Sequence, residues 1–369
     1  MEVVLISDGP LPIDSPVRKL PFFFAARLVD MSRVSPETVG EAKIAIVELL
    51  KAQDAGMTAL KASWSSIAEI PVICLVDKKN RREAIQAAAL GKTEMMQRDT
   101  LFALLIRRIR NLTSADVAEQ LPKNTGAKTH EAYRSGNAFL ESLCFSSIEG
   151  SKIPLNLMNE SASETLAALS LDGLASWLDA VNLHHSPTYS HSLTVAGLAG
   201  AFARHLGWSE KDCREVVAGG LVHDIGKMRI PLSILDKSEK LTEKERELIG
   251  RHPQFGREIL KPRIEVPIEI KKMAIQHHEF LDGSGYPDRL KGARISPKVR
   301  LITICDIFAA LTEKRSYREA DSPRTALTTM REMGAKLDQQ MVQQFARLVV
   351  QSELGDTNRA PAAASGAAA

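Results

Sequence analysis

The chain has 369 residues, of which 44% are hydrophobic and 25% charged, a composition typical of folded globular proteins. At roughly 150 residues per domain, the length predicts one large or two ordinary domains, and the composition excludes disorder over most of the chain. The 48 Lys and Arg residues nearly balance the 45 Asp and Glu residues, which leaves a net charge of +3. This balance argues against a nucleic-acid coat or a membrane-surface polycation, so no nucleic-acid partner is expected.

Membrane insertion and secretion are not predicted. No apolar run reaches the roughly 18 residues that a membrane span needs, and the first residues lack the basic segment that opens a signal peptide. The four cysteines lie far apart without a Cys-x-x-Cys pair: Cys74, Cys144, Cys213 and Cys305. Scattered buried thiols in a cytoplasmic protein are therefore predicted, rather than disulfides or a thiolate zinc site.

Residues 1–112 alternate short apolar, β-branched runs with helix-like stretches. Strands are predicted at Val3–Ser7, Lys43–Val47 and Pro71–Val76, and helices at Ala55–Ala68, Arg81–Leu90 and Thr100–Leu112. Strands that alternate with helices indicate a parallel, doubly wound α/β domain.

This order of elements resembles a response-regulator receiver domain, with changed residues at the phosphorylation positions. Asp8 stands alone after the first strand, where receivers carry an acidic pair, and Glu48 stands where the phospho-accepting Asp belongs. Asp77 replaces the usual Ser or Thr, and Arg98 lies near the expected Lys. The resemblance implies a degenerate receiver-like domain that serves partner contact or homodimer formation rather than phosphotransfer.

The remainder of the chain divides into three segments. Residues 113–175 are predicted to be a linker with short helices, and the Ala/Pro/Ser/Gly-rich residues 355–369 a disordered tail. Residues 176–354 are almost wholly helical in pattern. Helix starts are predicted there at Ser186-Pro187, Ser209, Thr242 and Ser296-Pro297. The predicted fold is thus multidomain, with an α/β domain followed by an all-helical bundle.

Histidines point to the function of the helical segment, because eight of the nine lie between His184 and His278. That is far more than uniform scattering would place there. The adjacent pair His223-Asp224 offers an imidazole and a carboxylate to one metal ion. The two oxygens of the carboxylate can also bridge to a second ion.

The other candidate ligands each have an ordinary structural explanation. His191 suits a hydrogen-bonded core position, and His252 a helix cap. The adjacent pair His277-His278 would place one ring inside and one outside a helix, about 100° apart. Asp306, within an apolar helix, is unfavourable unless it is paired or bound to metal. Because all of these residues fall on neighbouring helices, a shared metal site is the better interpretation.

The ordered series resembles the HD-GYP domain, a subclass of the HD metal-dependent phosphohydrolases. The basic set is matched by His191, His223-Asp224 and Asp306. The features that define the subclass are matched by His252-Pro253, His277-His278-Glu279 and the segment Asp282–Pro287. The match extends through Arg229-Ile230-Pro231, Leu241-Thr242-Glu243, Leu311-Thr312 and Arg315–Arg318.

This resemblance implies a phosphodiesterase that hydrolyses cyclic di-GMP to pGpG or GMP, with a hydroxide bridging two divalent metal ions. One ion would be held by His191, His223, Asp224 and Asp306, and the other by His252, His277 and His278, with Asp224 shared. The resemblance favours iron and then manganese, and the His/Asp ligand set also suits zinc.

Several residues are implied to act on the substrate. Lys227, one turn beyond the catalytic Asp224, is placed to bind the scissile phosphate or assist the leaving group. Lys237 and Arg315 are candidates for gripping the phosphates, and Tyr286 lies in a Gly-rich loop beside the site. For each cation an ordinary surface charge is the competing explanation, and for the loop a purely structural role. In the family this loop is also discussed as a contact surface for diguanylate cyclase domains, which are therefore candidate partners.

Three positions depart from the family pattern. The Glu that many members carry nine residues before the first His is Asn182, and the Asp six residues before it is His185. Two metal ions rather than three are therefore expected, unless His184 or His185 substitutes. The Asp expected three residues after Asp306 is Ala309, which can alter the support around the ligands.

Two other functions remain compatible with the sequence. The first is a metal-bound receptor or scaffold for a cyclic dinucleotide with little turnover, acting through the receiver-like domain. The second is a different HD hydrolase that acts on nucleotides or other phosphoesters.

Overall fold

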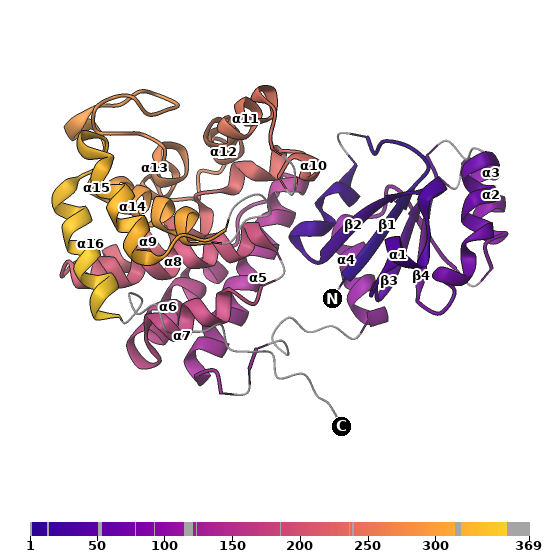
Figure 1. Ribbon diagram of the computed structural model, residues 1–369, viewed down its shortest axis with the longest axis horizontal. Coiled ribbons are helices and arrows are strands. Elements are labelled where there is room, and N and C mark those ends of the chain that lie inside the picture. The colour runs from indigo at the N-terminus through magenta and orange to yellow at the C-terminus, as the bar shows by residue number, and fades with distance from the viewer. Residues whose placement is uncertain are drawn as a thin grey trace.

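The computed structural model describes residues 2–12, 15–50, 54–77, 79–91, 93–113, 121–122, 124–184, 186–235, 237, 240–313 and 319–352. They form two bodies that lie side by side, an α/β domain and a larger helical domain (Figure 1). The predicted tail, residues 355–369, lies outside the described residues.

The α/β domain contains a five-stranded parallel sheet with the order β2-β1-β3-β4-β5. The strands are β1 (Glu2–Ser7), β2 (Ala25–Asp30), β3 (Ile44–Glu48), β4 (Val72–Val76) and β5 (Glu94–Gln97). This is the strand order of flavodoxin-like doubly wound sheets. The three predicted strands correspond to β1, β3 and β4, whereas the two edge strands were not predicted.

Helices cover both faces of the sheet, which explains why β3 and β4 are apolar throughout. Val4, Ile6 and Val47 face a core that includes residues of α1 (Pro36–Val39), α2 (Asp54–Ala62) and α3 (Arg81–Ala88). The alternate residues of the strands face the opposite core, which contains α4 (Phe102–Thr113).

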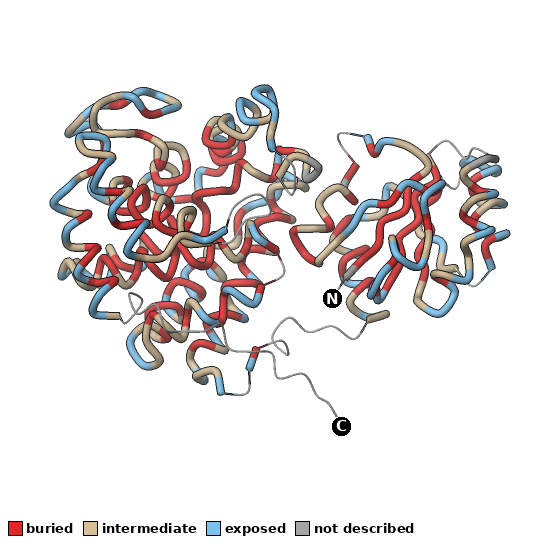
Figure 2. The backbone as a smooth tube through the Cα atoms, in the orientation of Figure 1, coloured by how far each residue is buried: buried red, intermediate tan, exposed pale blue. Residues whose placement is uncertain are grey.

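Aromatic residues join the α/β domain to the helical domain. The short 3₁₀ helix η1 (Pro16–Phe22) follows β1 and is succeeded by Phe23. The ring of Phe23 lies 5.4 Å from that of Phe102, 5.0 Å from that of Phe145 and 6.2 Å from that of Tyr189. Arg110 of α4 forms an ion pair with Glu141 of the helical domain. Buried residues accordingly lie on both sides of the junction between the two bodies (Figure 2).

Residues 113–175 differ from the predicted linker with short helices. The structure instead has α5 (Ala127–Glu149), of 23 residues, and α6 (Leu155–Leu171), of 17 residues. They pack on each other, and α6 also packs on α8 and α9. Small polar residues such as Ser161 and Thr165 are fully buried at these contacts. The segment therefore lacks the apolar stripe by which a packed helix is normally predicted.

The rest of the helical domain surrounds α8 (Pro187–His205) and α9 (Glu210–Val222). The other elements are α7 (Gly173–Val181), η5 (Ile225–Arg229), α10 (Leu232–Leu235), α11 (Glu243–Gly250), α12 (His252–Leu260), α13 (Ile268–Gln276), α14 (Pro297–Thr312), α15 (Pro323–Glu332) and α16 (Gln339–Gln351). The helix starts predicted from Ser186, Ser209, Thr242 and Ser296 are confirmed, because each side chain accepts an N-cap hydrogen bond.

Two predictions concern membrane spans and cysteines. Across the described residues, no helix has the length and apolar character needed to cross a bilayer. The four cysteines are buried free thiols, as predicted.

Candidate metal centre

The seven predicted metal ligands come together in the helical domain, five of them at helix ends. His191 lies in the second turn of α8 and Asp306 in α14. The other five stand at helix termini: His223 and Asp224 after α9, His252 at the start of α12, and His277 and His278 after α13. All are buried except His278, whose side chain is 26% exposed.

Gly226 sets the position of His252. A methyl group at residue 226 would overlap the carbonyl oxygen of His252 and the backbone nitrogen of Gly256. The glycine therefore lets η5 lie directly against the first turn of α12. This contact brings Nε2 of His252 to 3.3 Å from Oδ1 of Asp224.

His277 and His278 differ from the expectation of two diverging rings. α13 ends at Gln276, so the pair lies beyond the regular helix, and both rings face the cluster. Their ring centroids are 4.3 Å apart, and they lie 5.1 and 4.9 Å from that of His252. Thr303 of α14 donates a 2.8 Å hydrogen bond to the carbonyl of His277, which fixes the end of α13.

The predicted ligands form two groups, with His191, His223 and Asp306 in one and His252, His277 and His278 in the other, and Asp224 lies between them with His223 and His277. In the first, Nε2 of His191 lies 2.9 Å from Oδ1 of Asp306, and Nε2 of His223 lies 3.4 Å from Oδ2 of Asp224. The second contains His252, His277 and His278, whose donor atoms lie within 4.8 Å of one another. Asp224 thus presents Oδ2 to the first group and Oδ1 to the second.

Backbone carbonyls fix the tautomers of three of the histidines. Nδ1 of His223 donates to Gly220 O at 2.7 Å, Nδ1 of His252 to Ile249 O at 2.9 Å, and Nδ1 of His277 to Met273 O at 3.1 Å. In the neutral rings, Nε2 is therefore a lone-pair donor that faces the cluster. Nε2 of His223 is buried and has no hydrogen-bond partner among the described residues.

The arrangement fits a divalent metal ion. Nε2 of His252 and Nε2 of His277 are 3.0 Å apart, and a proton between them is disfavoured. Burial lowers the pKa of His252 to about 3 and holds that of His277 well below its usual value. Two lone pairs at this separation need a cation, and nitrogens bound about 2.1 Å from one ion at right angles would lie about 3 Å apart. The donor set therefore suits a bound metal.

Glu313 is a contact of the cluster that the sequence did not predict. Its Oε2 lies 2.9 Å from Nδ1 of His191. Burial disfavours protonation of His191, but the carboxylates of Glu313 and Asp306 outweigh it and raise the pKa of the ring to about 9. The available signal was spacing, because Glu313 follows Asp306 by seven residues and so shares its helix face.

The predicted substrate-binding residues have different surroundings. Nζ of Lys227 is 2.5 Å from Oδ2 of Asp224, inside the cluster. Lys237 lies 2.9 Å from both carboxylate oxygens of Glu245, in the cap of α11. The Tyr286 ring stacks on His278 at 4.9 Å and remains 38% exposed. Arg315 lies outside the described residues.

Glu279 organises the loop that carries Tyr286, a role that the sequence did not predict. Its buried carboxylate accepts hydrogen bonds from the backbone N–H groups of Asp288, at 2.6 Å, and Leu290, at 2.8 Å. A side chain at Gly285 would overlap backbone atoms of Phe280 and His278. The loop therefore lies directly on the end of α13, and Tyr286 covers His278.

His184 does not join the ligands. Its Nδ1 accepts a 3.0 Å hydrogen bond from the backbone of Ser186, and its ring packs between Tyr133 and Tyr189 at 6.0 and 5.5 Å. It is thus a core residue at the start of α8, where it cannot substitute for a missing acidic ligand. Asn182 is exposed, and His185 lies outside the described residues.

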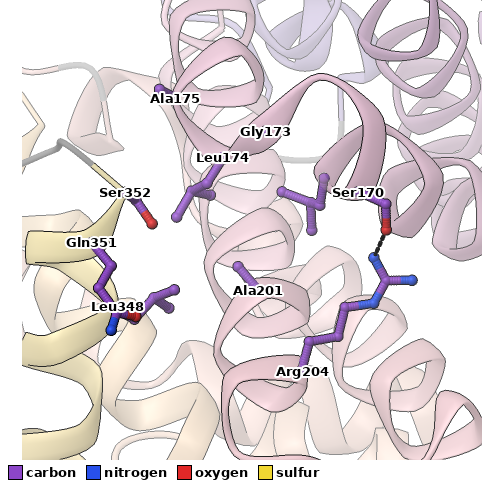
Figure 3. A pocket seen from close by; sticks show the side chains of 10 residues that line it. Ser170, Gly173, Leu174, Ala175, Ala201, Arg204, Leu348, Gln351 and Ser352 are labelled. Carbon is purple, nitrogen blue, oxygen red and sulfur yellow. Dashed lines mark hydrogen bonds between the residues drawn. The ribbon is translucent and has the colours of Figure 1, made fainter.

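A separate pocket of about 430 Å³ lies at the far half of α8, between α6, α7 and α16 (Figure 3). Leu174, Ala201 and Leu348 line it, together with Arg204, which donates to Ser170. It contains none of the seven ligands and is not part of the metal centre.

The sequence of the helical domain matches a known family. Residues 176–341 match the family described as HD domain. This segment contains all seven predicted ligands, five of them at the helix ends described above. Residues 176–341 form an HD domain.

Curated relatives share this HD domain. A cyclic di-GMP phosphodiesterase from Pseudomonas aeruginosa is 38% identical over 162 residues, 44% of this chain and 39% of the relative. The cyclic di-GMP phosphodiesterase response regulator RpfG from Xanthomonas campestris is 36% identical over 174 residues, 47% of this chain and 44% of the relative. The 3'3'-cGAMP-specific phosphodiesterase 1 from Vibrio cholerae is 41% identical over 144 residues, 39% of this chain and 33% of the relative. The chain thus spans less than half the length of each of these three relatives.

Proposed function

We propose that the HD domain is of the HD-GYP type and hydrolyses cyclic di-GMP with the help of two divalent metal ions. The observation that carries this proposal is the position of Asp224. Its two carboxylate oxygens face different groups of histidines, at 3.4 Å from His223 and 3.3 Å from His252. A carboxylate in this position suits a ligand shared between two ions.

The ligands divide between the two ions as follows. One ion is held by His191, His223, Asp224 and Asp306, and the other by His252, His277, His278 and Asp224. Iron is the favoured metal and manganese the next, since imidazole-rich sites select these over magnesium. When bound, the two ions would neutralise the phosphodiester charge and supply the hydroxide nucleophile at neutral pH.

Lys227 gives the centre a cation that the protein itself supplies. Its side chain is 16% exposed, and its Nζ lies 2.5 Å from Asp224. From η5 the ammonium group can bind a non-bridging oxygen of the scissile phosphate or protonate the leaving oxygen. Asp224 keeps Lys227 oriented toward the reacting centre.

Tyr286 lies at the partly exposed side of the centre. Tyr286 stacks on the partly exposed His278 and leaves an aromatic surface for a guanine base or a ribose. Lys237 and Arg315 are proposed to bind the second phosphate. Relatives with this domain are named as phosphodiesterases for cyclic di-GMP and for 3'3'-cGAMP, which supports a cyclic dinucleotide as the substrate class. The linear product pGpG and GMP are both compatible with this chemistry.

The test combines metal analysis with turnover on one sample. We expect anaerobically purified protein to hold two iron or manganese ions per chain and to hydrolyse cyclic di-GMP. The substitution His223→Ala should remove metal and lower turnover at least about 100-fold, because even an outer partner of a metal ligand is worth 10–100-fold. The matched control is His205→Ala, near the end of α8 and about 20 Å along the helix from His191. It should retain metal and turnover.

Other outcomes would change the proposed function or substrate, or overturn the proposal. Two bound ions and tight cyclic di-GMP binding without turnover would indicate a receptor or scaffold instead of an enzyme. Faster hydrolysis of 3'3'-cGAMP or of simple nucleotides would change the substrate. Wild-type metal content in the His223→Ala variant would show that the ligand assignment is wrong.

A further inference from the structure

His191 differs from the other buried histidines in how its outer nitrogen is held. His223, His252 and His277 each donate from Nδ1 to a backbone carbonyl. Each of those carbonyls belongs to the last turn of the preceding helix: Gly220 in α9, Ile249 in α11 and Met273 in α13. The last four carbonyls of a helix lack intrahelical partners, so they are available as acceptors. These three rings therefore need no side chain to orient them.

The position of His191 removes that option. It lies in the second turn of the 19-residue helix α8, which continues to His205. The carbonyls of the turns around it are engaged by N–H groups further along the helix. A side chain accepts the proton on Nδ1 instead, because Oε2 of Glu313 lies there at 2.9 Å.

Glu313 reaches this point from the end of α14. Its backbone N–H donates to Ala309 at 2.9 Å, which places it one turn after Ala309 and two turns after Asp306. Ala309 is fully buried and offers no carboxylate. One helix thus supplies both partners of His191, with Asp306 2.9 Å from Nε2 and Glu313 2.9 Å from Nδ1.

We propose that Glu313 is a positioning residue of the metal centre, which fixes the ring of His191 so that Nε2 faces the ion. A carboxylate behind a metal-bound imidazole sets the tautomer, holds the ring plane and strengthens the nitrogen as a ligand. The inference rests on the proposed function, because it assumes that His191 binds metal. Glu313 itself touches neither the substrate nor the reacting atoms.

The test is a metal-binding measurement on the full chain, independent of turnover. Metal is removed with a chelator, and Mn²⁺ is titrated back while the number of bound ions and their affinities are recorded. We expect Glu313→Ala to weaken one of two bound ions by about 10–100-fold, the usual effect of losing such a partner, and to leave the other unchanged. Glu313→Gln keeps an oxygen acceptor for Nδ1–H and should weaken the same ion less.

Two reference variants make the result specific. Glu332→Ala removes an exposed carboxylate at the end of α15 and should keep both affinities. His191→Ala should lose the ion that Glu313→Ala weakens. Unchanged affinities in both Glu313 variants, beside a lost ion in His191→Ala, would overturn the role of Glu313. Unchanged binding in His191→Ala as well would instead refute the ligand assignment of the proposed function. If Glu313→Ala fails to fold, the Gln variant decides the question by the same titration.

Discussion

Each of the two domains buries a cluster of acidic side chains, but the groups that face the carboxylates differ: an arginine in the α/β domain and mainly histidines in the helical domain. In the α/β domain the cluster lies at the carboxyl ends of the strands. Arg98, after β5, reaches Oε1 of Glu48 at 3.2 Å and Oε2 of Glu83 at 2.9 Å. Asp8, after β1, accepts a 2.8 Å hydrogen bond from the backbone of Leu50. Arg98 thus pairs with two buried carboxylates of its own domain, those of Glu48 and Glu83.

The HD-domain cluster contains lone-pair donors that face one another. The donors converge from helices far apart in the sequence, and Nε2 of His252 and Nε2 of His277 approach to 3.0 Å. Lys227 lies beside these donors and forms an ion pair with Asp224. The difference helps to separate a structural charge cluster from a functional one: in the first a guanidinium bridges two buried carboxylates, whereas in the second several imidazole nitrogens face one another and suit a metal ion.

This comparison also bears on the receiver-like interpretation of the first domain. Glu48 stands where a phospho-accepting Asp would be, and it is fully buried beneath Arg98. The ion pairs of Arg98 with Glu48 and Glu83 fit the prediction that this domain does not accept a phosphoryl group. We propose that its role is contact, since aromatic residues such as Phe23 already pack it against α5 of the helical domain.

Removing Arg98 should break the ion pairs of the α/β cluster and give the largest loss of stability. Arg98→Met leaves Glu48 and Glu83 without their cation, and breaking a buried ion pair in this way costs about 3–5 kcal/mol. Burial already raises the pKa of Glu48, so the folded state holds this proton more tightly than the unfolded chain does. Loss of Arg98 should raise that pKa further, and the stability of the variant should therefore fall as the pH rises through it. Denaturant unfolding at pH 5 and pH 8 measures both effects.

The double variant Glu48→Gln/Arg98→Met is the control for this prediction. It removes the buried charge with its partner and should recover part of the lost stability and most of the pH dependence. Metal content should stay at the wild-type value in both variants. A single variant that loses metal rather than stability would show that the two clusters are not independent.

Added metal should stabilise the protein through the HD-domain cluster and not through the Arg98 cluster. Mn²⁺ at 100 times its dissociation constant should add about 2.7 kcal/mol per site to the free energy of unfolding, because the ion binds the folded state. Asp224→Ala should abolish the increase, since it removes the shared ligand, while Arg98→Met should retain it. Thermal unfolding with and without metal makes the measurement. An equal increase in the Asp224 variant would place the binding elsewhere.

Residue type and order were enough to predict which side chains gather in the cluster, because a coordination sphere needs specific donors at specific points. The prediction that His191, His223 and Asp306 approach one another agrees with the structure. The central strands were predicted for a similar reason, since β3 and β4 are buried on both faces and apolar throughout.

The elements that were missed depend on tertiary contacts. β2 and β5 lie at the sheet edges and are partly exposed, so they carry mixed sequences such as that of Glu94–Gln97. The length of α5 and α6 was hidden by small polar residues buried between helices. The orientation of His278 depends on where α13 stops, and helix ends are poorly encoded in sequence. The pairing of Glu313 with His191 joins residues 122 positions apart.

The open side of the metal centre gives the smallest predicted effect and sharpens the distinction between holding metal and holding substrate. Tyr286 is 38% exposed and stacks on His278 without contributing to either ligand group. Stacking on a nucleobase is worth about 1–3 kcal/mol, so Tyr286→Ala should raise KM for cyclic di-GMP about tenfold. Metal content and kcat should change little, and Tyr286→Phe should preserve KM, because the ring rather than the hydroxyl makes the contact. Steady-state kinetics on metal-loaded protein measures this. A fall in kcat at unchanged KM would instead mean that Tyr286 acts through His278, as support for a ligand rather than as a surface for the substrate.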